Sequence, residues 1–320
     1  MIRRTIEISR EPSHLAVRDS QLLILRKDPK QKRLPTHPEN LAGSIPCEDI
    51  GVIMADSRET TYSHHALAQL AEYGAALVIC GRNHHPVGMY LPLSCNTQLL
   101  SRLDAQINAS KPTRKRLWAT IVIAKIRAQA TALPPCPEAQ ACRTRLLQLA
   151  TQVRSGDVTN IEAQAAAAYW PVLFSQCKSI NHPFRRKAGR PDAPAPNNLL
   201  DYGYAALRAA VARALISAGL LPALGIHHHG RSNPFSLADD LMEPLRPLID
   251  RRVRWLAQRD ELVLNQPTKA ELLDVLTEEI SVSDAKGPLL VGVTRYVASF
   301  VRVLTGESKT IDLPTAEFDS

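Results

Sequence analysis

The spacing of apolar residues changes once along the chain, at about residue 96, and this change determines the fold class. Before that point, apolar residues form short alternating or continuous runs at 5–8, 15–18 and 21–25, a pattern typical of β-strands. Three further strands and one helix are predicted, at 45–56, 75–80 and 87–93 for the strands and at 63–74 for the helix. The first 95 residues are therefore predicted to form a small β-rich domain.

After residue 96 the apolar residues recur with the three- and four-residue spacing of helices. Helices are predicted at 98–109, 115–133, 138–153, 158–169, 201–219, 269–279 and 287–304. Pro171 is expected to end the fourth of them, because proline cannot continue a helix. The prediction is an α+β protein, with an N-terminal β-rich domain at 1–95 and a larger all-helical domain at 96–320.

Composition limits the kinds of binding partner and the cellular compartment that we expect for this chain. The formal net charge of +8 favours a polyanionic partner, with nucleic acid ahead of a membrane surface. No stretch reaches the roughly 18 apolar residues that a membrane span needs, and the first residues lack the apolar core of a signal peptide. The six cysteines are scattered and form no CxxC pair, which argues against a disulfide framework or a zinc ribbon. We expect a reduced, cytoplasmic protein without membrane contact.

Basic residues gather at 111–116, 185–190 and 251–254. The second cluster belongs to a proline-rich segment at 182–198, which is predicted to be a loop. Two interpretations carry about equal weight, a solvated linker and an arm that contacts phosphates.

The segment 224–250 holds the strongest local signal for a site. Three consecutive histidines, 227–229, precede a turn and a short helix that carries Asp239, Asp240 and Glu243. Ser236, three residues before Asp239, resembles a capping box, and a helix from about residue 237 would place Asp240 and Glu243 on one face. One imidazole could then meet two carboxylates across the turn.

Such a donor set suits a hard divalent cation, Mg²⁺ or Mn²⁺, better than zinc. The alternative is a polar turn whose acids form salt bridges with Arg231 and Arg246. Pro244 and Pro247 favour the site, because they break or kink the helix just after Glu243.

Two segments together resemble a known family. They are NIEAQAAAAYW and DYGYAALRAAVARALISAGLLPALGIHHHGRSNPFSLADDLMEPLRPLID. They are similar to the Cas1 family of CRISPR-associated spacer-acquisition endonucleases and integrases, and the DLMEPLRP signature and GIHH turn most resemble its type II branch. The helical half carries most of the resemblance, and the N-terminal half matches in outline.

The resemblance implies that Glu162, His228 and Glu243 are metal ligands. The family's histidine follows the glycine of the turn by three residues, which selects His228 over its neighbours. Asp240 matches a second acid near the metal, and the resemblance leaves open whether it is a ligand or orients His228. Two departures from the family remove no ligand. Ala163 replaces a common glycine, which is a mild change. Asp201 replaces a common asparagine, and the stretch from Glu162 to His228 is longer than usual, chiefly through its proline-rich basic loop. Taken from the residues alone, the Glu162 carboxylate among alanines is more often solvent-facing.

The implied activity is metal-dependent DNA cleavage and integration, in which a DNA 3′-hydroxyl attacks a phosphodiester of the CRISPR repeat. It also implies a homodimer formed through the N-terminal domain, a Cas2 partner, double-stranded prespacer and repeat DNA, and help from Cas9 in choosing spacers. Two alternatives remain, a catalytically silent DNA-binding scaffold and a metal-dependent hydrolase of small phosphate substrates. Phosphate contacts are predicted for Arg185, Arg186, Lys187, Arg190, Arg231 and Arg246, although for Arg231 and Arg246 salt bridges to the acids are an equal alternative.

Overall fold

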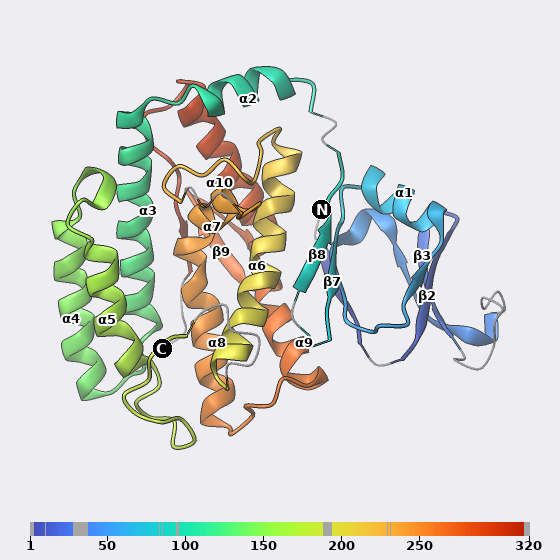
Figure 1. Cartoon of the computed structure of the whole chain (residues 1–320), viewed down its shortest axis with the longest axis horizontal. Helices are drawn as coiled ribbons and strands as arrows, with labels where there is room; N and C mark the ends of the chain where they lie inside the picture. The colour runs from blue at the N-terminus through green and yellow to red at the C-terminus, as the bar shows by residue number, and fades with distance from the viewer. Residues whose placement is uncertain are drawn as a thin grey trace. The chain divides into compact units, whose positions relative to one another are not determined.

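The structure is a computed structural model that describes residues 3–9, 11–27, 38–82, 84, 86–93, 96–187, 194–228, 230 and 232–316. It divides into two compact units, Met1–Ser94 and Cys95–Ser320, whose elements are labelled in Figure 1. Within the described ranges, no helix is both long and apolar enough to cross a membrane.

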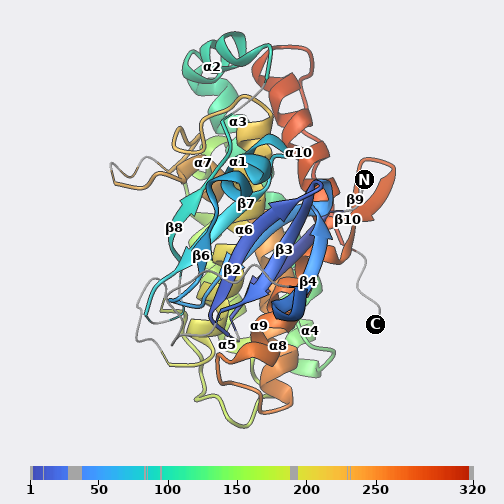
Figure 2. The same cartoon turned by 90° about the vertical axis from the view of Figure 1, so that its right-hand side faces the viewer.

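The N-terminal unit contains two four-stranded sheets. The first has the order β1-β5-β7-β8, from β1 (Arg4–Ile8), β5 (Ile50–Ala55), β7 (Ala76–Cys80) and β8 (Pro86–Tyr90); β8 alone is antiparallel to its neighbour. The second has the order β4-β3-β2-β6, from β4 (Leu41–Pro46), β3 (Gln21–Arg26), β2 (Ser13–Arg18) and β6 (Thr61–Tyr62). Figure 2 shows the second sheet face on.

The two sheets and α1 (His64–Glu72) share one apolar core, which includes Ile6, Leu15, Ile53 and Leu70. All six residues of β5 are buried, as expected for a central parallel strand. The prediction of a single strand at 45–56 was wrong. A 3₁₀ turn, η2 (Cys47–Asp49), separates the end of β4 from β5, because Cys47 turns into the core between them.

The C-terminal unit is mainly helical, so the α+β class is confirmed. Its helices are α2 (Leu99–Ile107), α3 (Lys111–Ala132), α4 (Pro137–Gln152), α5 (Ile161–Leu173), α6 (Asn197–Ser217), α7 (Ser236–Met242), α8 (Arg246–Gln258), α9 (Gln266–Asp274) and α10 (Leu289–Leu304). Short 3₁₀ turns are η1 (Pro38–Asn40) in the N-terminal unit, and η3 (Ser155–Asp157), η4 (Glu243–Leu245) and η5 (Val275–Thr277) here.

This unit also contains a small antiparallel sheet that the periodicity did not reveal. Its order is β10-β9-β11, from β10 (Ala285–Pro288), β9 (Glu279–Val282) and β11 (Pro314–Thr315). The helix predicted at 269–279 therefore ends earlier, at Asp274, and a 3₁₀ turn leads into β9. Strands of two to four residues are too short to show a clear alternation.

Three further helix boundaries each lie four residues from the predicted position. The helix α3 begins at Lys111, because Ser110 accepts a hydrogen bond from the Thr113 backbone and Pro112 fits the first turn; the basic run 111–116 is thus helical. The helix α5 continues past Pro171 to Leu173, since the fully buried Leu173 holds its last turn by packing. Helix α6 begins four residues earlier than predicted.

Helix α6 is the centre of this unit. It is buried around most of its circumference and packs on α7, α8, α9 and α10; Figure 1 shows it running beside α7 and α8. Its alanine-rich surface lets these neighbours approach closely. The closest approach is at Gly203, where an added Cβ would lie 2.5 Å from Ile249 Cγ2 of α8.

We therefore expect Gly203→Ala to lower the stability of the C-terminal unit by about 1–3 kcal/mol, because the new methyl group overlaps Ile249. Thermal unfolding of the full chain measures the effect. Gly287→Ala is the control, since its Cβ would meet only Arg295 Nη1 at 3.8 Å. Equal melting temperatures for the two variants would contradict the prediction.

Candidate active site

Glu243 lies where the chain passes from α7 into α8 through η4. Pro244 and Pro247 each lack an N–H and obstruct the preceding turn, so one continuous α-helix cannot form here. The predicted break after Glu243 is confirmed. The break leaves the Glu243 side chain almost wholly buried, at 4% exposure, and facing the neighbouring helices.

The predicted capping role of Ser236 was wrong. Ser236 is the first helical residue, and its hydroxyl donates to the Asn233 carbonyl oxygen. Asp239 instead accepts hydrogen bonds from Arg208 at 2.6 Å and from the Asn233 side chain at 2.8 Å. The Asn233 side chain also accepts from the Phe235 backbone N–H at 3.0 Å, so it bonds residues on both sides of the helix start.

Asp240 holds the histidine loop in place. Its Oδ2 accepts from the backbone N–H groups of Ile226 at 2.7 Å and His227 at 3.0 Å, and its Oδ1 lies 2.5 Å from His228 Nδ1. The carboxylate is fully buried. Gly225 is required here, because a Cβ would lie 2.9 Å from Asp240 Oδ2 and 2.3 Å from the His228 carbonyl oxygen.

Trp118 of α3 forms a cluster of three rings with His227 and His228, whose own ring centroids lie 5.1 Å apart in an edge-on contact. The His227 ring stacks on the indole, with centroids 4.1 Å apart and planes at 3°, whereas His228 meets the indole edge-on at 5.5 Å. The hydrogen bond to Asp240 raises the pKa of His228, with burial opposing and the charges of Asp240, Glu243 and Glu162 adding to the rise. His228 thus has Nδ1 engaged and Nε2 as its remaining donor atom, while His229 lies outside the described residues.

Glu162 reaches the same place from the first turn of α5. Asp157 fixes this helix start, because its carboxylate accepts from the backbone N–H groups of Ile161 at 2.8 Å and Glu162 at 3.0 Å. The Glu162 side chain is 23% exposed and is paired with Lys125, so it is neither buried nor the unpaired solvent-facing carboxylate that its alanine neighbours favoured.

Lys125 of α3 joins the two glutamates. Its Nζ lies 2.5 Å from Glu162 Oε1 and 2.5 Å from Glu243 Oε2. Burial alone would lower the pKa of Lys125, but Glu243 and Glu162 outweigh it and leave the pKa raised. Burial alone would raise the pKa of Glu243, but Arg246 and Lys125 leave it lowered. Lys125 and Glu243 are therefore both charged at neutral pH.

Lys125 is a residue of the site that was not predicted from the sequence. A signal was present, because Lys125 lies four residues after Ile121 and three after Val122 on the buried side of α3. A charged residue on an apolar stripe needs a charged partner.

The two glutamates pass one test as ligands of a divalent cation. They converge on a single positive atom, and Glu243 Oε2 has no hydrogen bond of good geometry despite its short distance to Lys125. Across the described residues, however, no three His, Cys, Asp or Glu side chains stand close enough together to hold a metal ion. The two carboxylates fit such an ion, and the imidazole has its Nε2 as the available donor.

Arg246 and a buried carboxylate complete the surroundings. Arg246 Nε lies 3.2 Å from Glu243 Oε1, and its guanidinium lies 4.9 Å from the centre of the Tyr204 ring. Tyr204 and Tyr169 both donate to Asp250, the latter at 2.9 Å. This places Asp250 at the junction of α5, α6 and α8.

The predicted phosphate-contacting residues have different surroundings. Arg185 and Lys187 are exposed, whereas Arg186 pairs with Asp201 and donates to Asn197 at 2.9 Å. Arg246 has the salt bridge to Glu243 described above. Arg190 and Arg231 lie outside the described residues.

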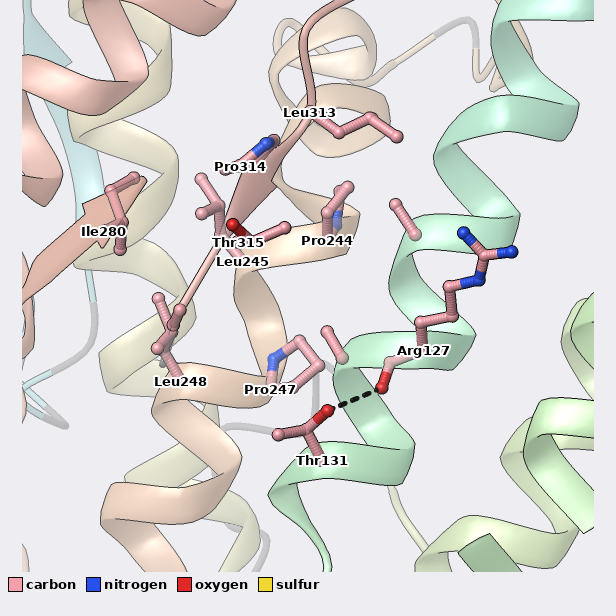
Figure 3. Close-up of a pocket in the computed structure, with 13 residues that line it drawn as sticks. Arg127, Thr131, Pro244, Leu245, Pro247, Leu248, Ile280, Leu313, Pro314 and Thr315 are labelled. Carbon is pink, nitrogen blue, oxygen red and sulfur yellow. Dashed lines mark hydrogen bonds between the residues drawn. The ribbon is translucent and has the colours of Figure 1, made fainter. Parts of the chain in front are cut away.

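A separate pocket of about 150 Å³ lies beside η4, between α3, α8 and the small sheet (Figure 3). Its lining is mostly apolar, including Pro244, Leu245 and Leu248, with Arg127 at one side. None of Glu162, His228, Asp240 and Glu243 lines it. The pocket is therefore not the site that the sequence predicted.

The model of the family described as CRISPR associated protein Cas1 matches residues 7–279. The chain belongs to the Cas1 family. A relative from Neisseria meningitidis serogroup C, named CRISPR-associated endonuclease Cas1, is 40% identical over 274 residues, covering 85% of this chain and 86% of the relative. The chain is thus a member of a family of CRISPR-associated endonucleases, and the resemblance seen in the sequence is confirmed.

Solved structures share the Cas1 fold at lower identity. A casposase bound to its integration product has a TM-score of 0.74 at 20% identity, covering 97% of this chain and 92% of the casposase chain. A chain of a Cas6-RT-Cas1–Cas2 complex has a TM-score of 0.75 at 16% identity, covering 99% of this chain and 36% of that longer chain. The family match at 7–279 includes all four predicted catalytic residues.

We expect Asp240→Asn to lower the pKa of His228, because the hydrogen bond to the charged carboxylate is its largest cause. The amide NH₂ would also face backbone donors, which should lower stability by about 1–3 kcal/mol. Ring-proton NMR titration of His228 and thermal unfolding measure the two effects. Asp239→Asn is the matched control, because Asp239 bonds Arg208 and Asn233 instead; a similar pKa change in that variant would contradict the assignment.

Burial raises the pKa of Asp250 from 3.8 to about 6, with the hydrogen bonds of Tyr204 and Tyr169 opposing. Between these values the folded chain holds a proton that the unfolded chain has released, so this group's contribution to stability falls as pH rises. Asp250→Asn has no such titration. The unfolding free energy of the wild type, relative to that of Asp250→Asn, should therefore fall as pH rises from 4 to 7. Urea unfolding measures both free energies, and a relative value that does not change with pH would refute the assignment.

Proposed function

We propose that the chain is a metal-dependent DNA endonuclease and integrase that inserts new spacers into a CRISPR array, in the type II branch of the Cas1 family. The observation that carries the proposal is the convergence of Glu162 and Glu243 on one positive charge, beside a histidine that Asp240 orients. The endonuclease name of the 40% identical relative and the integration product held by the structurally similar casposase support it.

In the proposed reaction a DNA 3′-hydroxyl attacks a phosphodiester of the repeat. A new P–O bond forms, the bridging P–O bond breaks, and the proton of the attacking hydroxyl is transferred so that the departing oxygen becomes a 3′-hydroxyl. With water as the nucleophile, the same site hydrolyses DNA. Both reactions need the charge on the non-bridging and leaving oxygens to be stabilised.

Glu162, Glu243 and His228 are the proposed ligands of Mg²⁺ or Mn²⁺. When bound, such an ion would supply Lewis-acid stabilisation of the phosphodiester. Asp240 is proposed as a positioning residue, because both of its oxygens are engaged by His228 and the loop backbone. Arg246 keeps Glu243 ionised by its charge.

The DNA is proposed to bind through Arg185, Arg186, Lys187, Arg190, Arg231 and Arg246. Such contacts neutralise phosphates without reading sequence. Arg185 and Lys187 are exposed and suited to the role. Arg186 must exchange its contact with Asp201 for a phosphate.

The N-terminal unit is proposed to form a homodimer, and the C-terminal unit to carry the catalysis. The presence of Cas2 in the complex with a structurally similar Cas1 supports Cas2 as a partner. Cas9 is proposed to help in spacer choice, and the site of action is the cytoplasm, where the double-stranded prespacer and the repeat are found.

Cleavage or disintegration of a branched DNA substrate with Mn²⁺ or Mg²⁺, compared with EDTA, tests the function. Glu162→Gln, Glu243→Gln and His228→Ala should each lower the rate at least 100-fold. Glutamine is used because Glu→Ala leaves the Lys125 ammonium buried beside a missing partner. The exposed Glu138→Gln is the control and should retain wild-type activity.

Three results would point elsewhere. Salt-dependent DNA binding without products under any metal would favour the silent scaffold. Preference for nucleotides over DNA would favour the small-phosphate hydrolase. Loss of activity in His227→Ala or His229→Ala, with His228→Ala active, would assign the ligand role to that other histidine.

A further inference from the structure

We propose that Lys125 is an internal cation that competes with the divalent ion for Glu162 and Glu243 and so sets the metal affinity of the site. The inference rests on the proposed function and adds a regulator to the same site. In this view the ammonium group holds the two carboxylates together before the ion binds, and it must withdraw when the ion arrives.

The geometry makes the two cations mutually exclusive. Lys125 Nζ is 2.5 Å from one oxygen of each glutamate. Carboxylate oxygens lie roughly 2.0–2.1 Å from Mg²⁺. An ion bound by the same two oxygens would therefore stand almost where Nζ stands, and both cannot occupy that place.

The charges lead to the same conclusion. Three carboxylates, those of Glu162, Asp240 and Glu243, share this region with the fixed cations Lys125 and Arg246. The side chains of Glu243 and Lys125 are only 4% and 11% exposed, so solvent screens them weakly. Adding two positive charges while the ammonium group remains would leave a buried excess of positive charge, which is strongly unfavourable.

The exchange would need only the side chain of Lys125 to move. Its backbone is fixed, because Ile121 and Ile126 on the same helix are fully buried. The side chain itself is an unbranched four-carbon stem whose ammonium group can swing without a change in the helix. Glu162, at 23% exposure, marks the side on which solvent reaches the pair.

A purely structural salt bridge makes a different prediction. If Lys125 only supported the fold, its removal would loosen the glutamates and leave the metal affinity unchanged or weaker. If it competes with the ion, its removal strengthens metal binding although it weakens the metal-free fold. Affinity and stability then change in opposite directions, which a structural role cannot produce.

The test measures Mn²⁺ binding to the full-length wild-type chain and to its Lys125→Met variant by isothermal titration calorimetry. We expect Lys125→Met to bind Mn²⁺ at least tenfold more tightly than wild type. In EDTA its melting temperature should fall, because the carboxylates lose their partner, and Mn²⁺ should raise it by more than in wild type. Lys111→Met, an exposed change on the same helix, is the matched control and should bind Mn²⁺ as wild type does.

An unchanged or weaker Mn²⁺ affinity in Lys125→Met would overturn the inference. If Lys125→Met does not fold, Lys125→Gln replaces it, since a neutral amide can still donate to both carboxylates, and the same gain in affinity is expected. Glu243→Gln separates the two proposals: loss of Mn²⁺ binding in it, with no gain in the Lys125 variants, rejects the inference alone. Absence of Mn²⁺ binding in wild type and the Lys125 variants, or its persistence in Glu243→Gln, rejects the metal-dependent function as well.

Discussion

The burial of the Glu243 carboxylate is the constraint on which the rest of the site depends. A charge at 4% exposure is tolerated only when opposite charges lie close by. Lys125 supplies one of them from α3 and Arg246 the other from the start of α8. Because Lys125 also reaches Glu162, this single buried acid ties α3, α5 and the α7–α8 break into one arrangement. A site that gathers acids must carry its own cations in order to fold.

Asp240, three residues before Glu243, is a second buried carboxylate, but different groups compensate its charge. It is fully buried as well, but backbone N–H groups of the preceding loop and the ring of His228 satisfy it. The loop is thereby wrapped around one carboxylate, and Trp118 stacks on the His227 ring, which in turn contacts His228 edge-on. Two neighbouring acids thus have separate roles, one gathering cations and the other fixing the direction of an imidazole.

The close packing of the helices around α6 keeps these parts in register. Gly203 lets α8 pack closely against α6. The hydroxyl groups of Tyr204 and Tyr169 both donate to Asp250, and the Arg246 guanidinium lies over the Tyr204 ring. The network connects the basic segment near Arg186 with the buried acids, since Arg186 lies 5.5 Å from the centre of the same Tyr204 ring. A phosphate that draws Arg186 or Arg246 away from its carboxylate would alter charges on both sides of that tyrosine.

The sequence alone determined the features that depend on near neighbours. The change of periodicity at about residue 96 reflects one-sided burial in strands and helices, and the break after Glu243 follows from the missing N–H groups of Pro244 and Pro247. The family resemblance selected Glu162, His228 and Glu243, whose metal-binding role stays a prediction. Only the tertiary structure brought Lys125 between the two glutamates and stacked Trp118 on His227. These contacts join residues that are distant in the chain, and periodicity, which records only which side of an element is buried, does not identify the partner on the other side.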